Sequence, residues 1–242
     1  MAVTTVFFSS QGRVAKTAGG TPTNAWAAVR ESNTTIGTNV ASTGANENFG
    51  AAMVAARGGS VFASNKRAYF YFNLSGITTT ITAITLTVRG GTNTLNQNGD
   101  WIVARANQDN DFGTIATSDY ALVFNSSTSF TSYSLSQTGN WSVNSNNSIL
   151  LNATAVSNAN SEGELCVCLM NYTYDYANGE VEENFGSIEN TLSFANSGTN
   201  RANLVVTHAA AGYGNIVNEV AVASIGSVNE VTTANIEQIN EV

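Results

Sequence analysis

Charged residues are scarce in this sequence, and cations are the scarcest of them. Asp, Glu, Lys and Arg together make up 11% of the 242 residues, against about 25% in a typical soluble protein. Nine Lys and Arg residues, of which two are lysines, stand against 17 acidic residues, so the net charge is -8. A nucleic-acid groove needs clustered cations to displace the counterions of the phosphates. The composition therefore excludes nucleic acid as a partner.

Long hydrophobic runs and a secretion signal are missing as well. The first residues, Met1 to Ser10, contain no basic cluster followed by an apolar stretch, so no signal peptide is predicted. No run approaches the roughly 18 consecutive apolar residues of a membrane-spanning helix. We therefore expect synthesis in the cytoplasm without export, and no membrane as a partner.

Histidine and cysteine are too few for several kinds of active site. His208 is the only histidine, so mechanisms that need two imidazoles are excluded. We expect His208 to be a surface residue at the end of a strand, without a catalytic role. Cys166 and Cys168 share one face of a predicted strand. They are expected to be buried free thiols, because a zinc site would need more soft ligands nearby. We expect neither a metal nor a cofactor.

Alternation of polar and apolar residues dominates the first 208 residues. Asn, Ser and Thr make up about a third of the chain, and the clearest period-two segments are Arg67–Leu74 and Ile81–Arg89. Further strands are predicted at Trp101–Ala106, Tyr120–Phe124, Phe130–Leu135, Ser148–Asn152, Glu164–Tyr172, Asn190–Phe194 and Ala202–His208. Turn residues such as Gly90-Gly91 separate them, with no convincing helix between. The pattern predicts an all-β, jelly-roll β-sandwich domain over residues 1–210.

A separate C-terminal repeat segment is predicted over residues 211–242. Val-Asn-Glu-Val or Ile-Asn-Glu-Val units begin at residues 217, 228 and 239, a spacing of 11. The repeat fits either a helix of nearly three turns per unit or a narrow β-solenoid with one short strand per unit. Either structure needs a partner for its apolar stripe, which favours self-association, most plausibly as a homotrimer, or anchoring. The residues expected to do this are Val217, Val220, Ile225, Val228, Val231, Ile236, Ile239 and Val242.

Several passages resemble a known domain family. They are Asn46–Gly50, Arg67–Ile77, Ile81–Val88 and Arg201–His208. In this order they resemble the DNRLRE-type, carbohydrate-binding-module-like jelly rolls, and the resemblance implies a fold more than an activity. The C-terminal repeats resemble those that end structural proteins of tailed bacteriophages.

Aromatic and acidic clusters are the remaining candidate sites. Tyr172, Tyr174 and Tyr176 share one face of an extended segment, which predicts a contact surface. Trp26, Trp101 and Trp141 are expected in the core, with a sugar-stacking platform as the alternative. The acidic loops that carry Asp109, Asp111, Glu180, Glu182 and Glu183 are expected to be solvated, with a hard-cation site as the alternative.

The leading hypothesis is a non-enzymatic virion structural protein of a tailed phage, as a capsid-decorating, head-fibre or tail-fibre component. Its expected location is the virion, and its expected partners are copies of itself and other virion proteins, with host surface glycans as a further candidate. One alternative is a carbohydrate-binding module that acts in adhesion. A jelly-roll enzyme that degrades polysaccharides is the weakest alternative, because the carboxylates are scattered along the sequence.

Overall fold

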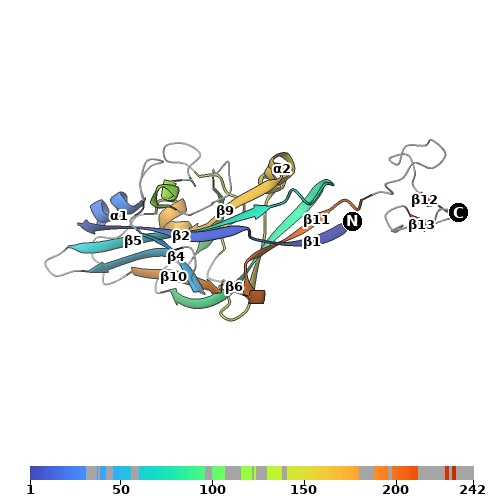
Figure 1. The fold of residues 1–242 in the computed structure, drawn as a ribbon. Helices are drawn as coiled ribbons and strands as arrows, with labels where there is room; N and C mark the ends of the chain where they lie inside the picture. The colour runs from blue at the N-terminus through green and yellow to red at the C-terminus, as the bar shows by residue number, and fades with distance from the viewer. Residues whose placement is uncertain are drawn as a thin grey trace.

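The computed structural model describes residues 1–30, 37, 39–41, 46–55, 60–95, 100–106, 116–121, 123, 130–137, 141–179, 188–195, 198–211, 227–228 and 231–232. The body contains β1 (Ala2–Phe7), β2 (Ser10–Gly20), β3 (Asn39–Ala41), β4 (Asn46–Ala55), β5 (Val61–Asn73), β6 (Ile81–Leu95), β7 (Trp101–Arg105), β8 (Asn146–Leu150), β9 (Glu164–Asn171), β10 (Ile188–Ala195) and β11 (Asn203–His208). Its helices are α1 (Pro22–Arg30), α2 (Ala153–Glu162), η1 (Thr117–Ala121), η2 (Tyr172–Tyr176) and η3 (Gly198–Asn200). The predicted all-β class is confirmed (Figure 1). Among the described residues, no helix is both long and apolar enough to cross a membrane.

The strands form one antiparallel sheet that curls into two layers. The small layer has the order β1-β11-β6-β8, and the large layer runs β3-β2-β5-β4-β10. Strand β5 pairs with β2 along one edge and with β4 and then β9 along the other, and β7 continues from β9. Strand β6 belongs to both layers, because its first part pairs with β11 and β8 and its last part pairs with β10.

The change of layer within β6 occurs at Gly90, where a turn was predicted. A Cβ at this position would overlap the backbone oxygen of Ser142 and the ring nitrogen of Trp141. Only glycine allows this close approach, so Gly90-Gly91 continues the strand and does not end it. The two layers are therefore joined through one unbroken strand.

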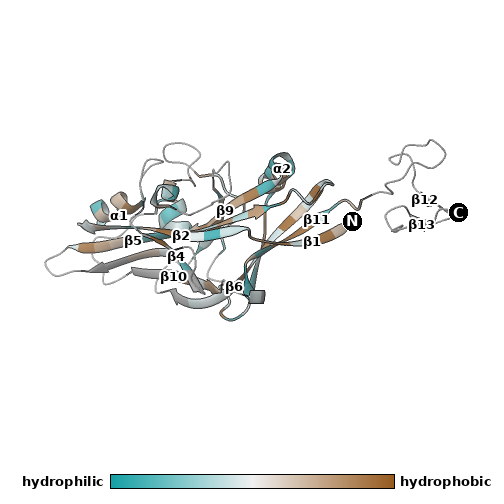
Figure 2. Ribbon diagram, viewed as in Figure 1, coloured by the Kyte–Doolittle hydropathy of each residue, from teal (hydrophilic) through white to brown (hydrophobic). Residues whose placement is uncertain are grey.

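The main core fills the space between the two layers, as in a β-sandwich. The large layer contributes Phe70 and Phe72 from β5 and Val167 and Leu169 from β9, while the small layer contributes Ile84, Leu86, Ile149, Leu204 and Val206. These side chains alternate with polar ones along their strands, as the period-two pattern predicts. Figure 2 shows the resulting hydrophobic segments in β9 and β11.

Two α-helices contradict the expectation that no helix intervenes. Helix α2 begins where the Asn152 side chain accepts a hydrogen bond from the backbone N–H of Ala155, and it ends at Gly163 with φ 67°. Both are ordinary capping signals, but the helix buries only Ala155 and Ala159, so it has almost no apolar stripe. Helix α1 begins at Pro22, a favourable first helical residue.

Two predicted strands also differ in the structure. Tyr120 lies in the short 3₁₀ helix η1 rather than in a strand over Tyr120–Phe124. In place of a strand at Phe130–Leu135, Ser132 makes one isolated bridge with Ala104. In the C-terminal segment, β12 (Ser227–Val228) and β13 (Val231–Thr232) pair antiparallel, with Val228 opposite Val231. The other expected oligomerisation residues lie outside the described part of the chain: Val217, Val220, Ile225, Ile236, Ile239 and Val242.

Candidate functional site

A buried ion pair lies on the outer face of the large layer. Alternation along β5 directs Phe70 into the main core and Arg67 and Tyr69 to the opposite face, where they meet a second hydrophobic cluster. Arg67 and Asp175 are both fully buried. The guanidinium contacts the carboxylate in a bidentate manner, with Nε to Oδ2 at 2.8 Å and Nη2 to Oδ1 at 2.6 Å. Bidentate geometry of this kind is the strongest form of such a pair.

The remaining donors of Arg67 hold segments that are distant in sequence. Its Nη1 donates to the backbone oxygen of Tyr120 in η1 at 2.7 Å, and its Nη2 donates to the backbone oxygen of Arg30 in α1 at 3.3 Å. The guanidinium also lies 4.0 Å from the centroid of the Tyr120 ring. The Tyr120 hydroxyl in turn donates to the backbone oxygen of Val29 and accepts from Asn65. Arg67 therefore clamps α1, η1 and η2 to the sheet.

The electrostatics of this clamp favour permanent charge on Arg67. Burial alone would lower its pKa, but the charge and hydrogen bonds of Asp175, together with the nearby Tyr120 and Tyr69, outweigh burial and raise the pKa of Arg67 well above its ordinary value. Burial raises the pKa of the Tyr120 hydroxyl, which stays neutral. Burial, together with the charge of Arg67, lowers the pKa of Arg30, although Asp175 opposes that change. The cluster therefore keeps Arg67 charged beside the Asp175 carboxylate.

The tyrosines predicted to share one face do not form such a stripe. Residues Tyr172–Tyr176 form a single π-helical turn, closed by the bond from the Ala177 N–H to the Tyr172 oxygen at 2.8 Å. Tyr174 is 5% exposed and packs edge-on against Trp26. Tyr172 and Tyr176 are half-buried and stack at 5.7 Å between ring centroids. The extended-strand geometry assumed from the sequence was wrong because the chain turns immediately after Asn171.

An aromatic row forms from three half-buried rings: Tyr172, Tyr176 and Phe130. Tyr176 stacks on Phe130 at 5.5 Å, and the guanidinium of Arg30 lies 5.5 Å from the Phe130 centroid. Two contacts fix the position of the turn that carries Tyr172 and Tyr176. The Asp175 carboxylate of this turn accepts from Arg67, and the Asp175 backbone oxygen accepts from Arg30 at 2.8 Å. A rigid, partly exposed aromatic row is a typical contact surface.

Replacing Tyr172 and Tyr176 by Ala should weaken binding to a glycan or neighbouring subunit and leave the chain folded. Each stacked pair contributes on the order of 0.5–1.5 kcal/mol beyond its buried area. The comparison variant is Tyr174→Ala, which opens a cavity against Trp26 and should lower stability more than either half-buried tyrosine. Thermal unfolding and a glycan-array or pull-down assay measure the two effects. Unfolding of the Tyr172/Tyr176 double variant would show that the row belongs to the core.

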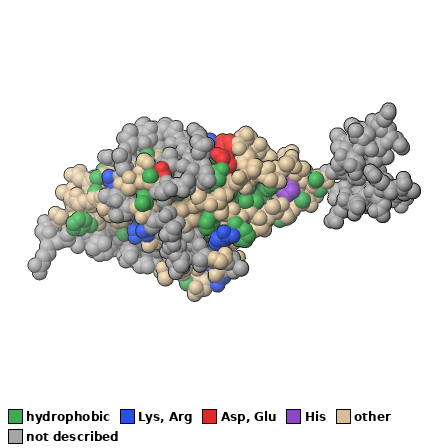
Figure 3. Space-filling model, viewed as in Figure 1, with side chains coloured by type: hydrophobic (Ala, Val, Ile, Leu, Met, Phe, Trp, Pro, Cys, Tyr) green, Lys and Arg blue, Asp and Glu red, His purple; other side chains and the backbone are tan. Residues whose placement is uncertain are grey.

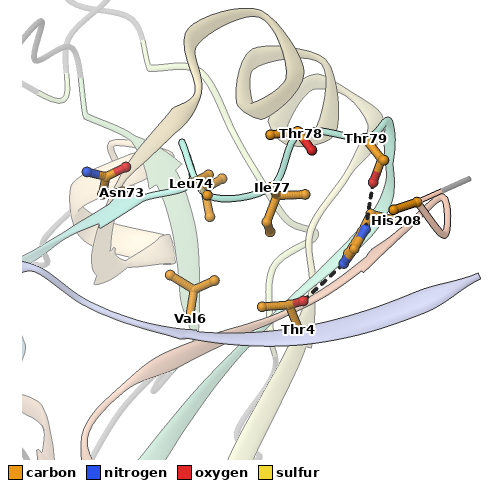
Figure 4. Close-up of a pocket in the computed structure, with 10 residues that line it drawn as sticks. Thr4, Val6, Asn73, Leu74, Ile77, Thr78, Thr79 and His208 are labelled. Atoms are coloured by element: carbon orange, nitrogen blue, oxygen red, sulfur yellow. Dashed lines mark hydrogen bonds between the residues drawn. The ribbon is translucent and has the colours of Figure 1, made fainter. Parts of the chain in front are cut away.

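A second candidate site is the half-open cavity beside His208, with a volume of about 310 Å³ (Figure 4). It lies between β1 and the segment that connects β5 to β6. His208 Nε2 lies 3.0 Å from the Thr4 hydroxyl, and Nδ1 lies 2.8 Å from both the Thr79 hydroxyl and the Ala209 backbone oxygen. The imidazole is thus held by neutral hydroxyl and carbonyl groups, which position the strand ends.

The other residues singled out from the sequence fall into two groups. Cys166 and Cys168 are buried free thiols, as predicted, and burial raises the pKa of both. Trp26, Trp101 and Trp141 are buried, which agrees with core packing. The acidic residues Asp109, Asp111, Glu180, Glu182 and Glu183 lie outside the described residues. Within the residues that are described, no three His, Cys, Asp or Glu side chains gather as a metal site.

One feature of the sequence indicates the buried pair of Arg67 and Asp175, although it was not part of the prediction. Arg67 stands within the hydrophobic strand Arg67–Leu74, on the same face as Tyr69 and Tyr71. An arginine on a buried face requires an acidic partner. Comparison with known proteins adds no further guide, since no protein-family pattern matches the chain and no curated protein matches it in sequence.

Proposed function

We propose that this chain is a non-enzymatic structural component of a tailed-phage particle, in which a jelly-roll domain is attached through its C-terminal repeats. The observation that carries the proposal is the pairing within one repeat: Val228 and Val231 of the Val-Asn-Glu-Val unit lie opposite each other in antiparallel strands. This favours a β conformation over a helix for that unit, in the form of a short hairpin rather than the single strand per unit of the β-solenoid alternative. Because the unit recurs every 11 residues, it supports a stack of short strands with a regularly spaced apolar stripe.

The arrangement of the body supports a structural role. Ion pairs hold parts of the fold together, with Arg67 and Asp175 in the interior and Arg105 and Glu162 at the surface. The jelly-roll assignment is supported by the position of the first strand, since β1 pairs with β11, the last strand of the body. An apolar repeat on such a rigid body supports oligomerisation, most simply as a trimer, or anchoring to other virion proteins.

Imaging of intact particles tests this proposal directly. Cryo-electron microscopy of phage particles whose genome encodes this chain should show the β-rich body at symmetry-related positions, with copies in multiples of three. Mass spectrometry of the same purified particles gives the copy number independently. If purified particles lack the chain, it is not a virion component.

Glycan-binding adhesion is a second candidate function, and it is compatible with the first. The aromatic row of Phe130, Tyr172 and Tyr176 favours it, because partly exposed aromatic rings with an adjacent cation suit sugar hydroxyl and C–H groups. The Tyr172/Tyr176 double variant described above tests this candidate separately from particle incorporation.

A further inference from the structure

Strand β1 forms one edge of the small layer. It pairs with β11 in unbroken register from Ala2 opposite His208 to Phe7 opposite Asn203, and no other described strand pairs with its second edge. An edge of this kind presents unpaired backbone N–H and C=O groups that can hydrogen-bond to another strand. Proteins usually block such an edge with a charged residue, a proline or a bulge. The described residues of β1, Ala-Val-Thr-Thr-Val-Phe, contain none of these features.

The outer face of the small layer has no acidic residue in its described strands, and its nearby cations are Arg89 in β6 and Arg201, which lies over the Phe7 ring. Val3, Thr5 and Phe7 are exposed on it, with Val3 at 65% and Phe7 at 40%. Behind them lie Asn203, Val205 and Thr207 of β11, Ala83, Thr85 and Thr87 of β6, and Asn146, Ser148 and Leu150 of β8. Arg89 is the only charged residue in the described strands of this face. On the cavity side, Figure 3 shows hydrophobic and uncharged side chains on the described surface around His208.

This distribution of charge favours a second copy of the chain as the occupant of the edge. Two copies that each carry a net charge of -8 repel one another wherever acidic surfaces meet. The small layer contains no acidic residue in β1, β8, β11 or the part of β6 that pairs with them. It therefore offers a surface on which two like-charged molecules can meet without repulsion. Depletion of charge is also characteristic of the centre of protein interfaces.

We propose that β1 pairs antiparallel with β1 of a second copy, about a twofold axis that passes midway between Thr5 and Thr5 of that copy. Such an axis, perpendicular to the sheet, keeps the outer faces together, so odd-numbered residues oppose odd-numbered residues. With Thr5 opposite its own copy, Val3 lies opposite Phe7 of the other chain, and Phe7 lies opposite Val3. Both large exposed side chains of the edge are then covered in aromatic–β-branched pairs. A twofold axis at Thr4 would instead place Phe7 opposite Met1.

The cavity beside His208 supports the same arrangement. Thr4 and Val6 of β1 line it together with Leu74, Ile77 and His208 (Figure 4). In the proposed register, Val6 of the second copy lies opposite Thr4 on the inner side of the sheet. It would extend the apolar wall of the cavity across the edge. Arg201 lies over the Phe7 ring at 4.7 Å, so the two copies of Arg201 stand at opposite ends of the pairing and do not face each other.

Disulfide trapping in the full chain tests this pairing and its register. Thr5→Cys should form a disulfide-linked dimer under mild oxidation, because directly opposite residues in antiparallel strands have Cβ atoms within reach of a disulfide. The native thiols, Cys166 and Cys168, are buried and provide a low background. The matched control is Ser148→Cys, which is exposed on the same face but on the opposite edge strand, β8. It should remain mostly monomeric on a non-reducing gel.

A mixing experiment distinguishes the proposed register from random collision. Chains with Val3→Cys and chains with Phe7→Cys should cross-link efficiently when mixed, and each should do so poorly alone. Equal trapping of Thr5→Cys and Ser148→Cys, or no preference for the mixed pair, would overturn the proposal. The readout uses purified chain without particles, so it is independent of whether the protein belongs to a virion.

Discussion

Replacing Asp175 by Asn is expected to lower the free energy of unfolding by about 3–5 kcal/mol. The substitution keeps the shape of the side chain and removes the charge that compensates Arg67, which is fully buried. In the variant, the buried guanidinium of Arg67 lacks its carboxylate partner. It still donates to backbone oxygens of η1 and α1, so it stays in the interior as an uncompensated charge. Urea denaturation of the wild type and the variant, at one fixed protein concentration, measures the difference.

The surface pair of Arg105 and Glu162 provides the matched control. The side chain of Arg105 is 33% exposed and that of Glu162 is 39% exposed. Arg105 Nη2 lies 2.9 Å from Glu162 Oε1. Glu162→Gln should change stability by at most about 1 kcal/mol, because solvent screens an exposed pair. Replacing both Arg67 and Asp175 by apolar residues of similar size should recover only part of the loss, because no lone charge remains buried but the backbone oxygens of Tyr120 and Arg30 lose a donor. An Asp175→Asn effect as small as that of Glu162→Gln would contradict the role of the pair as a clamp.

Replacing Ile225 and Ile236 by Ser is expected to abolish association through the C-terminal repeats. The two residues occupy the same phase of the 11-residue period, and full burial of an Ile side chain stabilises by roughly 1.5–3 kcal/mol in each copy. Loss of this contribution in every subunit should raise the protein concentration needed for association by several orders of magnitude. Sedimentation equilibrium and particle incorporation are the two measurements. If β1 also pairs as proposed, a dimer is the largest species that remains.

Glu230 and Glu237 lie between the apolar positions of the repeats and serve as the control. Glu230→Gln and Glu237→Gln should leave both association and incorporation unchanged, since these residues are not part of the apolar stripe. Removal of the chain after Gly212 should reproduce the Ile225/Ile236 result. If the shortened chain keeps its oligomeric state and still enters the particle, the repeats neither oligomerise nor anchor the protein.

Strand periodicity predicted the body well, and the errors have identifiable causes. Ile81–Arg89 was found because β6 faces the core on one side only, which gives clear alternation. The same pattern missed α2, because a helix that buries only Ala155 and Ala159 shows no apolar period. It also misjudged Tyr174, since a π-helical turn changes which side chains share a face and has no distinct period in so short a segment.

The clamp could be predicted only in part. Arg67 on a buried strand face indicates that an acidic partner exists, but 108 positions separate it from Asp175. Several acidic residues were equally possible partners from sequence alone. The choice depends on η2 returning over the outer face of the large layer, which is a tertiary event. Local patterns identify the need for a counter-charge, and the topology decides which residue meets it.

The antiparallel pairing of β1 with β11 has a mechanical consequence. Ala2 lies opposite His208, so the point at which the chain enters the body is beside the point at which it leaves for the C-terminal repeats. If the body is attached through the segment after His208, the attachment point lies at one end of the β1–β11 pair. Force applied there alone is not transmitted from one layer to the other. Tension between the two ends would instead separate β1 from β11 one hydrogen bond at a time, beginning at Ala2. Such a body suits attachment at one end of the chain. It would resist force poorly if its N-terminus and its C-terminal segment were pulled in opposite directions.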